Sequence, residues 1–585
     1  MSPNTNTVNS TIKRLRLWYG VMLLVLGIFM LRLFYIQIIR YDHYKNAALS
    51  DQLKQSEIPA TRGIILAHDG SGTVPIVLNQ QLDLIYADPT FIKNPDTVAV
   101  KLAGILKGNA GDYAKLLRTK HTRYVVLAKK VTPAQAKQVV ALKYPGVGAT
   151  AQDYRTYPQG QLASQVLGFV SDEGTGEYGL EQALNKELAG TPGKLKAITD
   201  VHGVPLAASH DNTEEAAQNG QNVTLTIDLA MQQQLENILL AGAQHAKAEK
   251  ASALIIDANS GAIKAMANFP TFDPSHYADV KDPSVFQNGA VADPIEPGSI
   301  MKTLTTAAAL DQGVISPNTT YYDPAHWLVD GFTIKNVEED GGAGTKSLYD
   351  LLNLSLNTGA TWELMQMGGG EINTKARNAW YDYLTNHYML GKETGIEQGY
   401  ESPGLVTGPK DTGSAIDLTY AEMTFGQAIL ATPIQMAAAL ATVVNGGTYY
   451  QPHLVDQYSD ASGKATQETV KTVHNDMKAS TAQALIPMLQ YSIDHHNPQP
   501  AFDQNKYTVG GKTGTAQIAV NGKYIDNSFN GTYIGFVGGN QPQYVICVFT
   551  QKPTIGGYAG TTAAQPIFVN LAHMLINNSF VSPKS

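Results

Sequence analysis

The longest apolar stretch of the chain lies near its N-terminus. Leu17 to Ile39 is a run of 23 residues in which Arg32 is the one charged residue, and it is long enough to span a bilayer as a helix. Three basic residues at positions 13, 14 and 16 precede it, and residues 1–16 contain no acid. The positive-inside bias then predicts a cytoplasmic tail over 1–16, one membrane helix over 17–39, and the rest of the chain outside the cytoplasmic membrane.

A cleaved signal peptide is the alternative interpretation of this stretch. Its apolar core is longer than that of a signal peptide, and no small-x-small cleavage site follows it. We therefore expect a permanent single-pass anchor.

Residues 40–215 alternate between short strand-like and helix-like patterns. Ile58 to Leu66 pass from a turn into a strand, and Thr132-Pro133 carry the N-cap and first-turn signals of a helix over 132–142. No pair of carboxylates stands in an obvious catalytic context. We expect an elongated module of mixed α/β structure with no reaction chemistry of its own.

From near Gly220 the pattern becomes that of a larger domain, which we place at 216–585. Val223–Ile227 is strand-like, and Asp228 is placed to cap a long helix that follows. Ser252–Asp257 and Ala262–Ala267 are two strand patterns joined by four turn-forming residues, which predicts a hairpin.

The end of the chain supplies three further strand patterns, at 507–519, 531–538 and 543–550, and an amphipathic helix over 563–576. Mostly helical patterns lie between the early and late strands. Two early and three late strands predict one five-stranded antiparallel sheet built from both ends of the domain. The fold class is then α+β, with flanking helices, a helical lobe against the sheet, and an active site between the two.

Composition narrows the functional classes. The 585 residues carry a net charge of −8, and their basic residues form no nucleic-acid footprint. The one cysteine, Cys547, lies in an apolar strand pattern, so an intrachain disulfide is excluded and a cysteine-based metal site is disfavoured. We expect Cys547 to be a small core residue.

Candidate chemistry begins at a Pro-Gly turn that delivers Ser299 to a largely apolar helical run ending at Leu310. Residues three apart share a helix face, so Ser299 and Lys302 can touch. A lysine desolvated by an apolar helix can take the serine proton, and the free N–H groups of the helix start can hold an oxyanion. The alternative is a serine N-cap followed by an exposed lysine.

Two later stretches favour the catalytic interpretation of Ser299 and Lys302 over the N-cap alternative. Ser355-Leu356-Asn357 lies in a helical region, and Lys512-Thr513-Gly514-Thr515 lies in a strand pattern. In this order, Ser-x-x-Lys, Ser-x-Asn and Lys-Thr-Gly form the signature of the penicillin-recognising acyl-serine transferases.

With these motifs in place, the chain resembles a class B penicillin-binding protein, a monofunctional peptidoglycan D,D-transpeptidase, along most of its length. Arg62-Gly63-Ile64, Arg155-Thr156-Tyr157-Pro158 and Gly179-Leu180-Glu181 resemble motifs of that family's pedestal (dimerisation-type) domain, here 40–215. Two positions depart from the family pattern: Ile300 replaces the usual threonine, and Ala67-His68-Asp69-Gly70 stands where Asp-Arg-Asn-Gly is more frequent. The length, and the lack of a repeated module after the catalytic domain, favour the division type over the elongation type.

The resemblance implies a reaction at D-Ala-D-Ala stem peptides, with β-lactams as inhibitors and no metal or organic cofactor. Ser299 would form the acyl-enzyme, with Lys302 as general base and Ser355 as proton relay. The implied substrate contacts come from Asn357 to the peptide backbone and from Lys512 to the terminal carboxylate. The remaining assignments are the hydroxyls of Thr513 and Thr515 on that carboxylate, close approach at Gly514, and an oxyanion hole from the backbone N–H groups of Ser299 and Thr515.

Other functions stay open on the same residues. A D,D-carboxypeptidase or β-lactamase would share this scaffold, and a non-catalytic β-lactam sensor or scaffold would share its binding residues. The chain shows no glycan polymerase signature of its own, so the resemblance also implies a partner: a SEDS-type glycosyltransferase, alongside other wall-synthesis membrane proteins.

Overall fold

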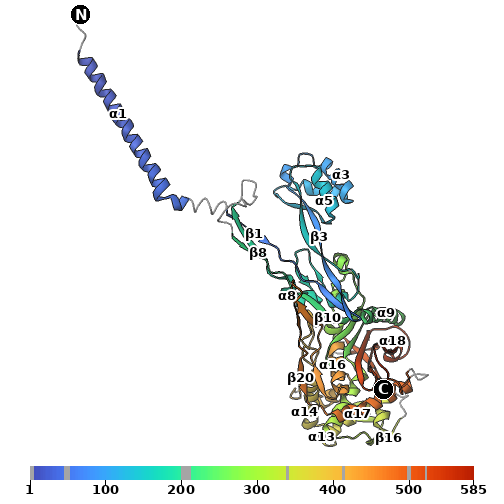
Figure 1. Cartoon of the computed structure of the whole chain (residues 1–585). Coiled ribbons are helices and arrows are strands. Elements are labelled where there is room, and N and C mark those ends of the chain that lie inside the picture. Colours follow the sequence, from blue (N-terminus) through green and yellow to red (C-terminus); the bar gives the residue numbers. More distant parts are fainter. Residues whose placement is uncertain are drawn as a thin grey trace. The chain divides into compact units, whose positions relative to one another are not determined.

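The computed structural model describes residues 5–44, 53–198, 213–336, 342–411, 415–496, 502–520 and 523–585. The chain divides into two compact units, Met1–Thr61 with Gly190–Gly220, and Arg62–Ala189 with Gln221–Ser585. Figure 1 shows the elements of both.

The first unit contains the predicted apolar helix. It begins as α1 (Thr5–Phe34) and ends as a π-helical turn, η1 (Tyr35–Ile39). Ile12–Ile39 has 28 residues, and its most apolar stretch of 18 residues has a mean hydropathy of 2.3 and buries none of its surface. It is long and apolar enough to cross a membrane. The unit also holds an antiparallel sheet of three strands, β1 (Leu53–Ile58), β8 (Gly193–Ile198) and β9 (Thr213–Glu215), in the order β1-β8-β9.

The second unit contains a seven-stranded sheet that crosses the domain boundary expected at 215/216. Its path is β19-β18-β10-β2-β3-β4, and β5 pairs with β3 beside that path. β10 runs parallel to β2, whereas the other pairs are antiparallel. The strands are β2 (Ile65–Asp69), β3 (Gly72–Ala87), β4 (Val125–Val131), β5 (Val147–Thr156), β10 (Asn222–Asp228), β18 (Val455–Ser459) and β19 (Ala465–Gln467).

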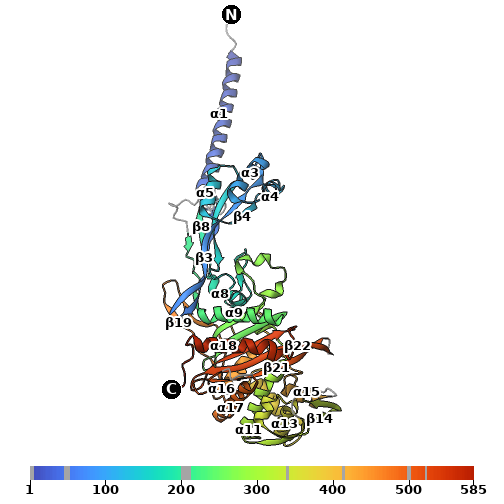
Figure 2. The same cartoon turned by 90° about the vertical axis from the view of Figure 1, so that its right-hand side faces the viewer.

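One end of this sheet carries a small helical layer. α3 (Pro95–Leu106), α4 (Ala110–Leu117) and α5 (Pro133–Ala141) bury a core of their own against β3, β4 and β5. The helix predicted over 132–142 is confirmed, because Thr132 and Gln135 form a capping box at its start. Figures 1 and 2 show the long strand β3 running between this layer and the rest of its sheet.

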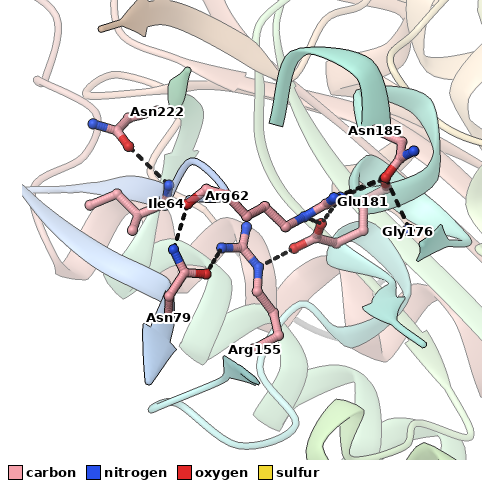
Figure 3. A network of polar contacts seen from close by, with 8 residues as sticks. All are labelled: Arg62, Ile64, Asn79, Arg155, Gly176, Glu181, Asn185 and Asn222. Atoms are coloured by element: carbon pink, nitrogen blue, oxygen red, sulfur yellow. Dashed lines mark hydrogen bonds and ion pairs between the residues drawn. The ribbon is translucent and has the colours of Figure 1, made fainter. Parts of the chain in front are cut away.

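The three pedestal-like motifs meet at one buried carboxylate (Figure 3). Glu181, with no exposed side-chain surface, accepts from Arg62 Nε at 2.8 Å and from Arg155 Nε at 2.7 Å. Arg155 also donates to Asn79 Oδ1, and Arg62 donates to Asn185 Oδ1. Charge-assisted hydrogen bonds therefore link strands β3 and β5, and the segment before β2, to residues 181–185, which lie far from them in the sequence.

The predicted five-stranded antiparallel sheet is confirmed. Its order is β12-β11-β23-β22-β21, so the two early strands form one side and the late Lys-Thr-Gly strand β21 lies at an edge. The strands are β11 (Lys250–Asp257), β12 (Ile263–Phe269), β21 (Thr508–Val520), β22 (Lys523–Gly538) and β23 (Pro542–Gln551).

Alternate residues of these strands enter two different cores, as the period of a strand requires. On one face, Ala253 and Ile255 pack with the helices α9 (Leu229–Ala246) and α18 (Gln565–Asn577) (Figure 2). On the other, Leu254 and Ile256 pack with α11 (Met301–Gln312) and α16 (Pro433–Val444). Cys547 lies in this second core, as predicted, and burial raises the pKa of its thiol.

The helical lobe lies between the early and late strands in the sequence. Its helices are α11 (Met301–Gln312), α12 (Leu348–Asn353), α13 (Asn357–Gly368), α14 (Thr374–Asp382), α15 (Ile416–Thr424), α16 (Pro433–Val444) and α17 (Ala479–His496). Two small antiparallel pairs accompany them: β13 (Thr320–Asp323) with β16 (Gly344–Ser347), and β14 (His326–Val329) with β15 (Phe332–Lys335).

Shorter elements complete the second unit. They are η2 (Pro89–Phe91), α6 (Ser164–Leu167), β6 (Phe169–Val170), β7 (Gly176–Glu177), α7 (Gly179–Ala183), α8 (Asn185–Ala189), η3 (Pro274–Asp279), η4 (Pro283–Phe286), α10 (Gly289–Ala292), η5 (Gly298–Ile300), η6 (Tyr383–His387), β17 (Thr448–Tyr450), β20 (Thr472–Asn475) and η7 (Gly560–Ala564).

Candidate active site

Ser299 lies in the 3₁₀ turn η5, which leads directly into α11. Gly298, just before it, has a φ of +63°, and a Cβ at that position would lie 2.9 Å from Thr515 O. The turn therefore requires glycine, both for its conformation and for the close approach of β21. Gly298 N–H also donates to Gly426 O at 3.0 Å, which ties the turn to the lobe.

Lys302 is the second residue of α11, and none of its surface is exposed. Its Nζ lies 3.0 Å from Ser299 Oγ, 3.1 Å from Ser355 Oγ and 2.8 Å from Asn357 Oδ1. It also donates to Ser355 O at 2.5 Å. The structure thus brings the first two sequence motifs together around one buried amine, and the exposed-lysine alternative does not describe this residue.

Ser355 occupies an unusual backbone position between α12 and α13. Its φ is +57°, in the left-handed region that a serine rarely adopts. This conformation aims both its carbonyl and its hydroxyl at Lys302. A strained residue that contacts a buried amine is typical of a functional constraint.

The third motif lies on the edge strand β21. Lys512 is 1% exposed, and its Nζ lies 3.1 Å from Thr513 O and 3.3 Å from Thr513 Oγ1. Thr515 Oγ1 accepts from Gly560 N at 3.0 Å, which leaves the hydroxyl proton available to donate. The Thr515 backbone nitrogen lies 3.2 Å from where a Gly298 Cβ would be, so this strand passes directly beside the Ser299 turn.

Gly514 packs closely against the serine turn. A Cβ there would lie 2.2 Å from Thr532 Oγ1 and 2.8 Å from Pro297 O. The Thr532 hydroxyl also donates to Pro297 O at 2.6 Å. The space at Gly514 is therefore filled by the protein's own packing against the serine turn, and close approach of a substrate at this residue stays a prediction.

Sequence reasoning missed Glu363 of α13. It is fully buried; Oε2 accepts from Thr306 Oγ1 at 3.1 Å, and Oε1 has no hydrogen-bond partner among the described residues. Burial raises its pKa to about 8, while the Thr306 hydrogen bond and the Lys302 charge act in the opposite direction. Burial therefore favours the neutral form of the Glu363 carboxyl. Nothing in the sequence distinguishes it from a surface glutamate.

Two more carboxyls flank the serine turn. Burial raises the pKa of Glu296, three residues before Ser299, although it accepts from Ala428 N and Tyr524 Oη. Burial, and then the charge of Glu296, raise the pKa of Glu422 to about 6. The position of Glu296 next to the Pro-Gly turn is the sequence feature that could have indicated it as a site residue. Within the described ranges, His, Cys, Asp and Glu form no group of three or more that could hold a metal ion.

Two family models match the chain. Residues 57–225 match the penicillin-binding protein dimerisation domain, and residues 251–573 match the penicillin-binding protein transpeptidase domain.

Named relatives cover nearly the whole chain. The penicillin-binding protein PbpB of Mycobacterium tuberculosis is 30% identical over 98% of this chain and 86% of its own length. Stage V sporulation protein D of Bacillus subtilis is 29% identical, covering 94% and 84%. The peptidoglycan D,D-transpeptidase FtsI of Escherichia coli K12 is 26% identical, covering 95% and 90%.

Solved structures share the fold. Penicillin-binding protein 2X of Streptococcus thermophilus superposes with a TM-score of 0.71 at 23% identity, covering 90% of this chain and 80% of that one. Penicillin-binding protein 3 of Mycobacterium tuberculosis, complexed with aztreonam, gives 0.68 at 24% identity, covering 90% and 98%.

The chain therefore belongs to the penicillin-binding transpeptidase family. Because a dimerisation domain precedes its transpeptidase domain, it is a class B penicillin-binding protein, and its relatives include the division-type FtsI. It is a peptidoglycan D,D-transpeptidase.

Proposed function

We propose that the transpeptidase reaction proceeds through an acyl-enzyme on Ser299. The observation that carries this proposal is the position of the buried Lys302 amine, within hydrogen-bond distance of the Ser299 hydroxyl, the Ser355 hydroxyl and the Asn357 amide oxygen. Burial disfavours a charged ammonium, which is the condition under which a lysine amine can accept a proton.

Acylation follows from these contacts. Ser299 Oγ attacks the carbonyl carbon of the penultimate D-Ala while Lys302 Nζ takes the hydroxyl proton. The oxyanion forms between the backbone N–H groups of Ser299 and Thr515. The bond to the last D-Ala then breaks, and Ser355 relays a proton from Lys302 to the leaving amine. A contact between Ser355 and Lys512, which would extend this relay, stays a prediction.

Four side chains orient the donor peptide in this scheme. The Asn357 amide hydrogen-bonds the peptide backbone, and Lys512 supplies positive charge for the terminal carboxylate. The Thr513 and Thr515 hydroxyls donate to the same carboxylate. β21 is an edge strand of its sheet, which supports binding of an extended peptide by strand addition.

The second half-reaction distinguishes a transpeptidase from a hydrolase. The amine of a neighbouring stem attacks the acyl carbon and releases Ser299 Oγ, which takes up the proton that the amine loses, so that one cross-link forms for each D-Ala lost. β-Lactams present a strained amide to the same serine and acylate it. The complex of the Mycobacterium tuberculosis relative with aztreonam is consistent with such a site.

Incubation with a stem-peptide donor and an amine acceptor tests this function. The expected product is the cross-linked dimer with release of D-Ala. Hydrolysed donor alone would instead indicate a D,D-carboxypeptidase, and no product would indicate a non-catalytic binding protein. Replacement of Ser299 by Ala is expected to abolish product formation.

We further propose the domain limits and the membrane orientation predicted from the sequence. These are a cytoplasmic tail over 1–16, a membrane helix over 17–39, a pedestal over 40–215 and a catalytic domain over 216–585 outside the cytoplasmic membrane. The apolar run over 17–39, with basic residues before it, supports this arrangement.

The same anchor and pedestal are proposed to bind a SEDS-type glycosyltransferase and to couple polymerisation to cross-linking. Replacing Leu17–Ile39 by an unrelated membrane helix should reduce co-purification with that enzyme and reduce its polymerase activity. Unchanged association and activity would reject the helix contact, and the same result after deletion of the pedestal would reject the partnership.

A further inference from the structure

Helix α13 begins without an ordinary cap. Its N-cap residue, Leu356, makes no side-chain cap hydrogen bond within the part of the chain that the structure describes. A helix start exposes N–H groups that a serine, threonine, aspartate or asparagine usually satisfies from the N-cap position. Here the catalytic Ser-x-Asn motif ends at the first helical residue, Asn357, so a cap at the usual position would have to replace its middle residue.

A distant segment provides the cap instead. Asn336, at the end of β15, accepts from Thr358 N at 3.1 Å through Oδ1. The Thr358 hydroxyl donates to Asp323 Oδ2 at 2.7 Å, and Thr358 O accepts from Trp327 Nε1 at 3.0 Å. All three polar groups of Thr358, a residue with no exposed surface, are therefore held by the segment that contains β13, β14 and β15.

The holding groups are themselves satisfied. Asn336 Nδ2 donates to Thr358 Oγ1 at 2.7 Å and to Asp323 Oδ2 at 3.1 Å. The other Asp323 oxygen accepts from Ala325 N at 2.7 Å. Asp323 is fully buried, so these donors stabilise its carboxylate and fix the network in one arrangement.

The peptide group before Asn336 holds the catalytic residue directly. Lys335 O accepts from Asn357 Nδ2 at 3.2 Å, while Asn357 Oδ1 accepts from Lys302 Nζ at 2.8 Å. Lys335 and Asn336 thus form hydrogen bonds with Asn357 and Thr358, respectively. A flipped Asn357 amide would turn its NH₂ toward a lysine amine and its oxygen toward a carbonyl. These two contacts therefore allow one orientation of the amide.

We propose that Asn336 is a positioning residue for the transpeptidase reaction, acting through Asn357. With Thr358 and Asp323 it holds the Lys335 carbonyl where that carbonyl fixes the Asn357 amide. One N–H of that amide is then used by Lys335, and the other serves the peptide backbone of the donor or the amide side chain of a β-lactam. This inference rests on the proposed function of Asn357.

The test uses the full-length protein in detergent with a fluorescent penicillin, and it separates the non-covalent dissociation constant from the acylation rate constant k2. Asn336→Ala and Thr358→Val are expected to lower k2/Kd by about tenfold to a hundredfold, the loss that a misplacement of about 1 Å can cause. Thr358→Ser keeps the hydroxyl and is expected to stay within about threefold of wild type. Thr333→Ala is the matched control, since Thr333 lies exposed on the same strand β15.

A double-mutant cycle distinguishes positioning from general damage. If Asn336 acts through Asn357, adding Asn336→Ala to Asn357→Ala causes less than about a twofold further loss. Losses that multiply in the double variant would overturn the proposal. So would near wild-type k2/Kd in both Asn336→Ala and Thr358→Val.

Two further readouts keep the outcome clear. Should Asn336→Ala not fold, the Thr358→Val and Thr358→Ser pair in both the wild-type and Asn357→Ala backgrounds carries the same comparison. Failure of the proposed function gives a different result. In that case the fluorescent penicillin would fail to label the wild-type protein, or would label its Ser299→Ala variant, before Asn336 is changed.

Discussion

Glu363 makes the stability of the protein depend on pH in a predictable direction. Burial raises the pKa of its carboxyl from the ordinary 4.5 to about 8 in the folded protein. Below pH 4.5 the folded and unfolded chains both hold the proton, and the contribution to stability is fully present. As the pH rises toward 8, the unfolded chain ionises first, so the folded state loses stability relative to it.

The size of this loss follows from the shift. Each pH unit between the two pKa values costs about 1.4 kcal/mol, so the full window costs at most about 5 kcal/mol. Glu363→Gln removes the titration while keeping an acceptor for the Thr306 hydroxyl. Unfolding carries an entropy of about 2 cal/mol/K per residue. For a unit as large as the second one, each kcal/mol of stability therefore shifts the melting temperature by about 1 °C.

Thermal unfolding of the full-length protein in detergent, followed by tryptophan fluorescence at pH 5.0, 6.5 and 8.0, measures the effect. We expect Glu363→Gln to melt close to wild type at pH 5.0 and up to about 5 °C above it at pH 8.0. Glu173→Gln, an exposed site in the same unit, is the control, with a change of less than about 0.5 kcal/mol expected.

A melting-temperature difference between Glu363→Gln and wild type that stays constant across this pH range would exclude a raised pKa of Glu363. So would a difference that shrinks as the pH rises. Either result would mean that the Glu363 carboxyl does not retain its proton beyond the unfolded pKa.

Further predictions concern the lysines and the pedestal network. Lys302→Ala should abolish acylation by penicillin at any concentration, because it removes the proton acceptor, whereas Lys512→Ala should mainly raise Kd; a near wild-type k2 in Lys302→Ala would contradict the general-base assignment. Glu181→Gln should destabilise the second unit by about 3–5 kcal/mol, since it leaves two buried guanidinium groups without their carboxylate. Denaturant unfolding measures this loss, and a change as small as that of Glu173→Gln would contradict it.

The large catalytic sheet was predictable because its signals are local. Short runs rich in apolar residues mark β11, β12 and β23, and four turn residues at 258–261 join the first two into a hairpin. The contact between Ser299 and Lys302 was predictable for the same reason, since the spacing of three residues on a helix start places them together.

Other features depend on contacts between distant segments, which a single sequence does not encode in any local pattern. The parallel pairing of β10 with β2 joins strands from either side of the expected boundary at 215/216. Asp323 and Asn336 are ordinary turn-forming residue types in the sequence, and their roles arise only where they meet Thr358. Glu363 fits a helical pattern like any solvent-facing glutamate, although it is fully buried.

Intact-mass spectrometry shows directly whether Ser299 is the residue that a β-lactam acylates. The full-length protein is incubated with benzylpenicillin, weighed, and then digested to locate the adduct. We predict one adduct of the antibiotic's mass on wild type, carried by the peptide that contains Ser299, and none on a folded Ser299→Ala variant. An adduct on Ser299→Ala, or on a different residue of the wild-type protein, would show that Ser299 is not the nucleophile.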